Sequence, residues 1–120
     1  MKRLLVLAAA IEGLTGLVLL AYPPIAVRLL LGTEIAGPSV WISRFAGIAL
    51  IGLAVACWPD SNTVRAFFGM SVYNTLAMLY LAYVGVTGGS GILLWPAVAV
   101  HAGLSVLLVR TWWNQRNILD

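Results

Sequence analysis

Apolar residues fill four long stretches of this chain, and short polar or glycine-rich stretches separate them. The apolar stretches cover residues 4–22, 40–58, 66–84 and 92–109. Each has about 18 to 20 residues, which at a rise of about 1.5 Å per residue can cross roughly 30 Å of hydrocarbon. A backbone exposed to lipid must pair its N–H and C=O groups within its own segment. The pattern therefore predicts four transmembrane helices.

The connections between these stretches contain helix-breaking residues. Pro23 and Pro24 should end the first helix, because proline has no N–H and restricts the residue before it. The segment 25–31 is apolar but contains Arg28, so we expect an amphipathic turn that lies in the membrane interface. Ser39 is the expected N-cap of the second helix.

Two further connections, at residues 59–63 and 85–91, are a tight polar turn and a glycine-rich link. Links this short make neighbouring helices antiparallel. We therefore expect an all-α fold with a single domain over residues 1–120, an antiparallel transmembrane four-helix bundle.

The composition requires a bilayer as partner. Of the 120 residues, 62% are apolar and only 9% are charged, and the mean hydropathy is +0.99. A soluble domain has about a quarter of its residues charged. The net charge of +3 does not indicate nucleic acid, because the seven basic residues are scattered along the chain.

The positions of the basic residues predict the orientation. Arg28, and marginally Arg44, would lie on one side of the membrane. The other basic residues all fall on the opposite side: Lys2, Arg3, Arg65, Arg110 and Arg116. Basic residues accumulate on the cytoplasmic side, so we expect a multi-pass protein of the cytoplasmic (inner) membrane with both termini in the cytoplasm.

Several polar residues interrupt the predicted spans at similar depth. Glu12 and Asn74, with Tyr73 beside it, lie roughly 12 Å from the inner ends of their helices, and His101 lies roughly 13 Å from the outer end of its helix. Arg44 is about 6 Å deep, and its long side chain can bend inward. A charged side chain at a helix centre costs about 2.5 to 3.5 kcal/mol in lipid. These five residues should therefore face one another inside the bundle.

Two interpretations of this polar layer are open. In the first, a Glu12–Arg44 ion pair, hydrogen-bonded to Tyr73 and Asn74, has a purely structural role and fixes the helices in register. Alternatively, Glu12, Arg44, Tyr73, Asn74 and His101 form a site that binds a ligand or handles protons, because ionisable residues at this depth are often functional. One histidine and one cysteine exclude a zinc or bis-histidine haem site within one chain. We expect no cofactor, no metal and no enzymatic activity.

The runs at 16–20 and 29–32, with Pro23 between them, and the run Arg44-Phe45-Ala46-Gly47-Ile48-Ala49 resemble small DoxX-like four-helix membrane proteins. The similarity spans most of the chain. The better-known members are membrane subunits associated with quinone-linked oxidoreductases. The resemblance implies an accessory or quinone-proximal role, with no catalytic residue to carry over.

The chain is also similar to small multidrug resistance transporters, which have four helices and a membrane-buried glutamate in the first helix. Glu12 stands at the matching place. The tryptophan-glycine motif of their third helix is missing, because Tyr73-Asn74 stands there instead. The strong charge bias also favours a single orientation, whereas many of those transporters form antiparallel dimers.

The function expected first is therefore binding of a hydrophobic or amphipathic small molecule, such as a quinone-like one, or an accessory role in a larger membrane complex or homo-oligomer. The first alternative is a proton-coupled transporter that uses Glu12. The second is a purely structural subunit.

Overall fold

The chain folds into five α-helices in the computed structural model, which describes residues 2–60 and 63–119. Their bounds are α1 Lys2–Ala21, α2 Pro23–Leu31, α3 Pro38–Ala56, α4 Thr63–Val86 and α5 Leu94–Leu119. Four of them, α1, α3, α4 and α5, are long and apolar enough to cross a membrane. The prediction of an all-helical chain with four such helices is confirmed. The fourth span was predicted over residues 92–109, whereas the corresponding helix, α5, starts at Leu94 and continues to Leu119.

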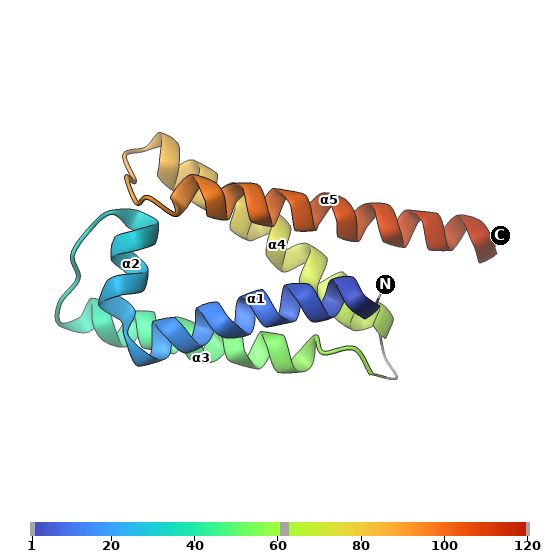
Figure 1. The fold of residues 1–120 in the computed structure, drawn as a ribbon, viewed down its shortest axis with the longest axis horizontal. Coiled ribbons are helices and arrows are strands. Elements are labelled where there is room, and N and C mark those ends of the chain that lie inside the picture. The colour runs from blue at the N-terminus through green and yellow to red at the C-terminus, as the bar shows by residue number, and fades with distance from the viewer. Residues whose placement is uncertain (1, 61–62, 120) are drawn as a thin grey trace.

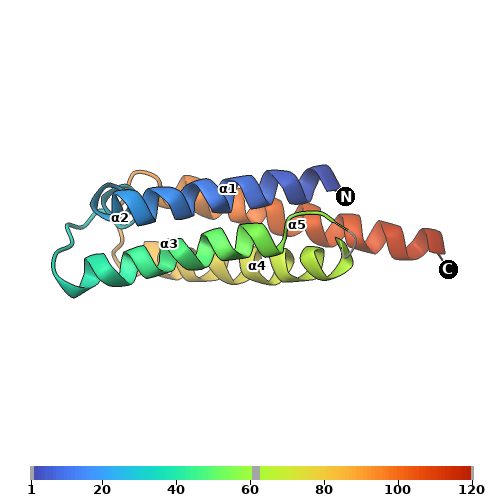
Figure 2. The ribbon, with the colours of Figure 1, turned by 90° about the horizontal axis from the view of Figure 1, so that it is seen from below.

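The four long helices form two pairs. α1 packs mainly on α3, and α4 packs mainly on α5. In Figure 1, α4 crosses behind α1 and reaches the α5 layer, and Figure 2 shows the long helices lying along one common axis. The start of α1 and the end of α5 point to the same end of the molecule, which we call the terminal end.

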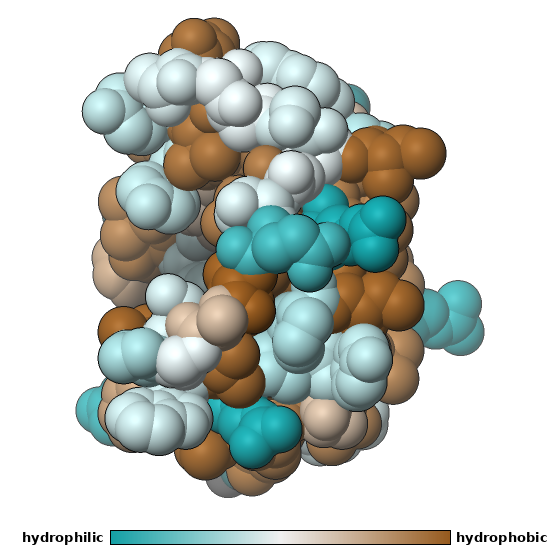
Figure 3. Space-filling model, turned by 90° about the vertical axis from the view of Figure 1, so that its left-hand side faces the viewer, coloured by the Kyte–Doolittle hydropathy of each residue, from teal (hydrophilic) through white to brown (hydrophobic). Residues whose placement is uncertain are grey.

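The short helix α2 lies at the opposite end, which we call the α2 end, and contacts α1, α3 and α5. The expected interfacial turn is thus a helix. It begins directly at Pro23 and ends at Leu31, and the C-cap residue Gly32 has a left-handed φ of 72°. Viewed onto this end, the surface mixes polar and apolar residues (Figure 3). This mixture suits a layer between lipid and water.

The expected N-cap of the second helix is wrong. Gly37 is the N-cap of α3, and Pro38 is its first residue. Gly37 has a φ of 60°, which suits glycine, and Pro38 needs no hydrogen-bond acceptor at a helix start. Ser39 therefore lies within the helix. In the predicted turn at 59–63, residues 61 and 62 lie outside the described residues.

Two glycines let α1 and α3 approach very closely. A Cβ atom on Gly16 would lie 2.7 Å from the carbonyl oxygen of Gly47, and one on Gly47 would lie 2.6 Å from that of Gly16. Such close backbone contact needs small residues, which are enriched between membrane helices. The small residues of α1 thus bring it against α3.

The apolar core occupies the half of the bundle near the terminal end, where α1 starts, α4 starts and α5 finishes. Its buried residues are Leu5, Ala8, Ala9, Ala54, Cys57, Ala66, Phe67, Met70, Leu104 and Leu108. Many other large apolar side chains are exposed on the long helices, among them Phe45 at 73% and Phe68 at 66%. Such an exposed apolar surface is what a bilayer covers.

Candidate functional site

A polar cluster lies at the edge of this core, between α1 and the α4–α5 pair. Glu12 is one helical turn beyond the buried Ala8, and Asn74 is one turn beyond the buried Met70. Both polar side chains therefore continue the buried faces of their helices. Glu12 is 1% exposed and Asn74 is 0% exposed. His101 of α5 completes the cluster.

Asn74 fixes the orientation of the histidine. Its Nδ2 donates a hydrogen bond of 2.9 Å to the carbonyl oxygen of Met70, so its Oδ1 is the atom that faces His101. His101 Nδ1 lies 2.9 Å from that oxygen. Because the amide oxygen can only accept, Nδ1 carries a hydrogen and donates it. Asn74 thus selects the tautomer of His101.

This arrangement leaves one oxygen of Glu12 without a hydrogen bond. Glu12 Oε1 lies 3.6 Å from His101 Nδ1, close enough for an ion pair if the imidazole is protonated but beyond hydrogen-bond distance. It is the one buried side-chain oxygen or nitrogen without a hydrogen-bond partner among the described residues. An unsatisfied buried polar group costs about 1 to 3 kcal/mol, and more when it is charged. A bound proton, or a ligand that donates a hydrogen bond to Oε1, would remove this cost.

Tyr73 connects the two ionisable groups. Its hydroxyl group interacts with the carboxyl group of Glu12. Its ring stands edge-on to the imidazole of His101, with 6.0 Å between the ring centroids and an interplanar angle of 78°. Ser105 lies one turn further along α5 and donates a 2.7 Å hydrogen bond to the carbonyl oxygen of His101. The cluster, here defined as Glu12, Tyr73, Asn74 and His101, joins three helices.

Arg44 does not join the cluster. Its side chain is exposed on α3, and no ion pair links it to any residue that the structure describes. The structure therefore does not contain the Glu12–Arg44 ion pair that was one of the two interpretations, and the expectation that Arg44 faces the other four polar residues is wrong. The reason lies in the helix face: Gly47, one turn from Arg44, faces α1, whereas Arg44 points away from the bundle. The depth estimate placed Arg44 near the layer but could not give its direction around the helix.

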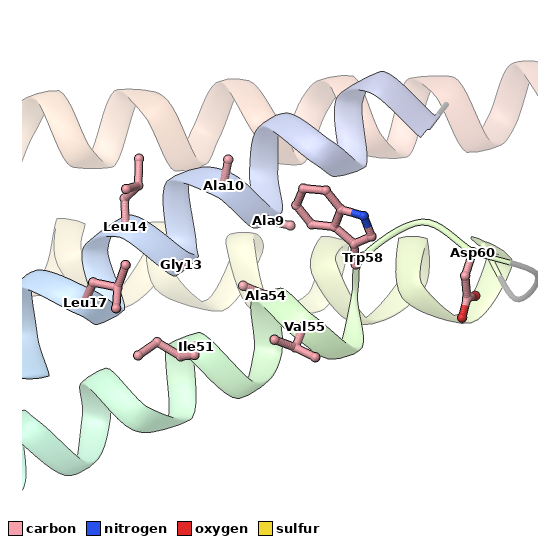
Figure 4. A pocket seen from close by; sticks show the side chains of 10 residues that line it. All are labelled: Ala9, Ala10, Gly13, Leu14, Leu17, Ile51, Ala54, Val55, Trp58 and Asp60. Carbon is pink, nitrogen blue, oxygen red and sulfur yellow. The ribbon is translucent and has the colours of Figure 1, made fainter.

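The sequence did not predict an apolar groove between α1 and α3. It has a volume of about 740 Å³ and is lined by Ala9, Ala10, Gly13, Leu14, Leu17, Ile51, Ala54, Val55, Trp58 and Asp60. Figure 4 shows these side chains on the two helices, with Trp58 and Asp60 in the segment that follows α3. No member of the cluster lines this groove. The small residues at positions 8–10 and 13 were the sequence feature that could have predicted it, because small side chains leave space between helices.

Within the described ranges, 2–60 and 63–119, no group of three or more His, Cys, Asp or Glu residues could hold a metal ion. Comparisons with protein-family models, with curated proteins and with solved structures give no match. The function proposed below therefore depends on the chemistry of the cluster.

Proposed function

We propose that this chain is a non-enzymatic membrane protein whose cluster binds the polar head of a hydrophobic or amphipathic small molecule. One observation carries the proposal: the buried Oε1 of Glu12 has no hydrogen-bond partner among the described residues, although a histidine and a tyrosine stand beside it. If the cluster only held the helices together, a hydrogen bond to this atom would make the bundle more stable.

The chemistry of the unpartnered atom limits the ligand. A carboxyl oxygen accepts hydrogen bonds, so the ligand should present a donor such as a hydroxyl or an amino group. The aromatic edge of Tyr73 and the apolar core next to it favour an attached ring or hydrocarbon body. A reduced quinone-like molecule fits both requirements, as does a hydrophobic amine.

The boundary between the two helix pairs offers a route to the cluster. Glu12 belongs to the α1–α3 pair, while Tyr73, Asn74 and His101 belong to the α4–α5 pair. Each pair packs more extensively within itself than against the other. A small separation of the pairs would therefore open the cluster toward lipid, without breaking the contacts that hold each pair together.

The proposed setting is an antiparallel four-helix bundle in the inner membrane, with the terminal end in the cytoplasm. The basic residues at the helix ends support this orientation, because five of them belong to the terminal end and only Arg28 and Arg44 to the other half. Arg28 pairs there with Glu34 at 3.6 Å. An accessory role in a complex, implied by the resemblance to DoxX-like proteins, stays a prediction.

Native mass spectrometry of the protein released from mild detergent tests the proposal. We expect a fraction of the chain to carry a small molecule that is neither detergent nor phospholipid, because the cluster has a buried acceptor to satisfy. The Arg44→Gln variant serves as the control and should retain the same molecule, because Arg44 lies outside the cluster. Wild-type protein that carries only lipid or detergent would contradict the proposal.

The second candidate function is proton-coupled transport of a cationic hydrophobic substrate. It is favoured by the exposed position of Arg44, which forms no ion pair with Glu12, since such a pair would have held the carboxylate ionised. A cation that binds Glu12 would displace its proton, because two positive charges cannot share one buried carboxylate at low cost.

Ligand-induced proton release distinguishes this candidate from simple binding. In weakly buffered detergent solution, a hydrophobic quaternary ammonium ion should release about one proton per bound molecule from wild-type protein and none from the Glu12→Gln variant. Release that is equal in both proteins, or absent in both, would exclude transport through Glu12 and leave the binding proposal intact.

A further inference from the structure

The last part of α5 carries a second groove, of about 450 Å³, which is separate from the cluster. It is lined by Ser105, Val106, Val109, Arg110, Trp113 and Asn114. Except for the buried Ser105, these residues are exposed. Val106, Arg110 and Trp113 follow one another at spacings of four and three residues, which places them on a single face of the helix.

The groove changes from apolar to polar along the helix axis. Its deeper part is formed by Val106 and Val109, and its outer part by Arg110 and Asn114. Arg110 stands about 24 Å along the axis from Leu94, near the boundary of a hydrocarbon core of roughly 30 Å. Trp113 lies one turn beyond Val109, and tryptophan prefers this interface. A phospholipid has the same arrangement, with an apolar acyl chain toward the membrane centre and a polar headgroup at its surface.

Charge decides which headgroup fits. The guanidinium group of Arg110 can hold a phosphate with two hydrogen bonds, and the amide of Asn114 adds a donor beside it. The terminal end is strongly basic. Its cationic residues are Lys2, Arg3, Arg65, Arg110 and Arg116, against Asp60 as the acidic residue described there.

We propose that this groove is a binding site for an anionic phospholipid, with its phosphate on Arg110 and Asn114 and an acyl chain along Val106 and Val109. The site is independent of the small-molecule function of the cluster. It gives α5 a defined contact with the anionic leaflet, and Trp113 marks the depth of that contact.

The test uses full-length protein in mild detergent with equal amounts of phosphatidylglycerol and phosphatidylcholine of identical acyl chains. Native mass spectrometry reports how much of each lipid remains bound. We expect wild-type protein to retain more phosphatidylglycerol than phosphatidylcholine. Arg110→Gln should reduce this preference about fivefold, because the attraction between one arginine and an anionic lipid surface is worth about that factor in affinity. Val106→Trp keeps every charge but fills the apolar part of the groove, and it should also lower retention.

Arg116→Gln is the matched control. Arg116 lies on the same helix but packs over the ring of Trp112, 4.8 Å from its centroid, and does not line the groove. Its replacement should change the lipid preference by less than about twofold, because only the diffuse surface charge falls. Equal losses for Arg110→Gln and Arg116→Gln, or unchanged lipid retention in Val106→Trp, would each overturn the proposal.

Discussion

Replacement of Gly47 by leucine is expected to destabilise the bundle more than any other single change on α3. Even a Cβ atom there would lie 2.6 Å from the carbonyl oxygen of Gly16 and 2.8 Å from the backbone nitrogen of Leu20. These are backbone atoms of α1, which cannot rotate away as a side chain could. The helices must separate, and we expect the free energy of unfolding to fall by about 3 kcal/mol.

Gly52→Leu is the matched control for this prediction. Gly52 lies on the same helix, is exposed, and has nothing within 4 Å of a built Cβ atom. Leucine there would face lipid and has the higher helix propensity, so stability should stay equal or rise by up to about 1 kcal/mol. Both variants can be unfolded by titration with a denaturing detergent and followed by circular dichroism. Equal stability of Gly47→Leu and Gly52→Leu would show that α1 and α3 do not cross at these glycines.

Replacement of Glu12 by glutamine is the second change with a large expected effect, and this effect is on binding. The amide keeps the size of the side chain but removes the carboxylate, so we expect ligand retention to fall at least tenfold, or about 1.4 kcal/mol. The free energy of unfolding should stay within about 1 kcal/mol of wild type, because Oε1 of Glu12 makes no hydrogen bond with the described residues that the change could remove.

Asn74→Ala provides the opposite pattern for comparison. Asn74 is fully buried, donates to Met70 and accepts from His101. Its removal leaves His101 Nδ1 without its partner, while the Met70 carbonyl keeps its backbone hydrogen bond within α4, and should lower the free energy of unfolding by about 1 to 3 kcal/mol. If Glu12→Gln lost as much stability as Asn74→Ala, Glu12 would be a structural residue like its neighbour.

The sequence predicts the helices well because each apolar run is long and the connections contain Pro23, Pro59 or several glycines. The depth of the polar residues was also informative: Glu12, Asn74 and His101 do meet. Their depths follow from a constant rise per residue, and the apolar stripes of the same helices turn them inward.

The direction of a side chain around a helix and the pairing of helices could not be obtained in the same way. Arg44 has a suitable depth but lies on the exposed side of α3, because the Gly16–Gly47 contact rotates that helix so that Gly47 faces α1. The start of α3 was also misplaced, because Gly37 and Pro38 form a start without a capping side chain. Helix α5 continues to Leu119 because no proline or glycine follows residue 103, whereas the end of the apolar run at residue 109 marks only the end of the predicted span.

The central claim is that the cluster binds a small molecule through Glu12. The most direct test compares native mass spectra of wild-type, Glu12→Gln and Arg44→Gln proteins, purified in parallel in the same mild detergent. We predict a bound small molecule on wild-type and Arg44→Gln proteins and its loss from a stably folded Glu12→Gln protein. Equal occupancy in wild-type and Glu12→Gln proteins, or no such molecule on any of the three, would contradict the claim.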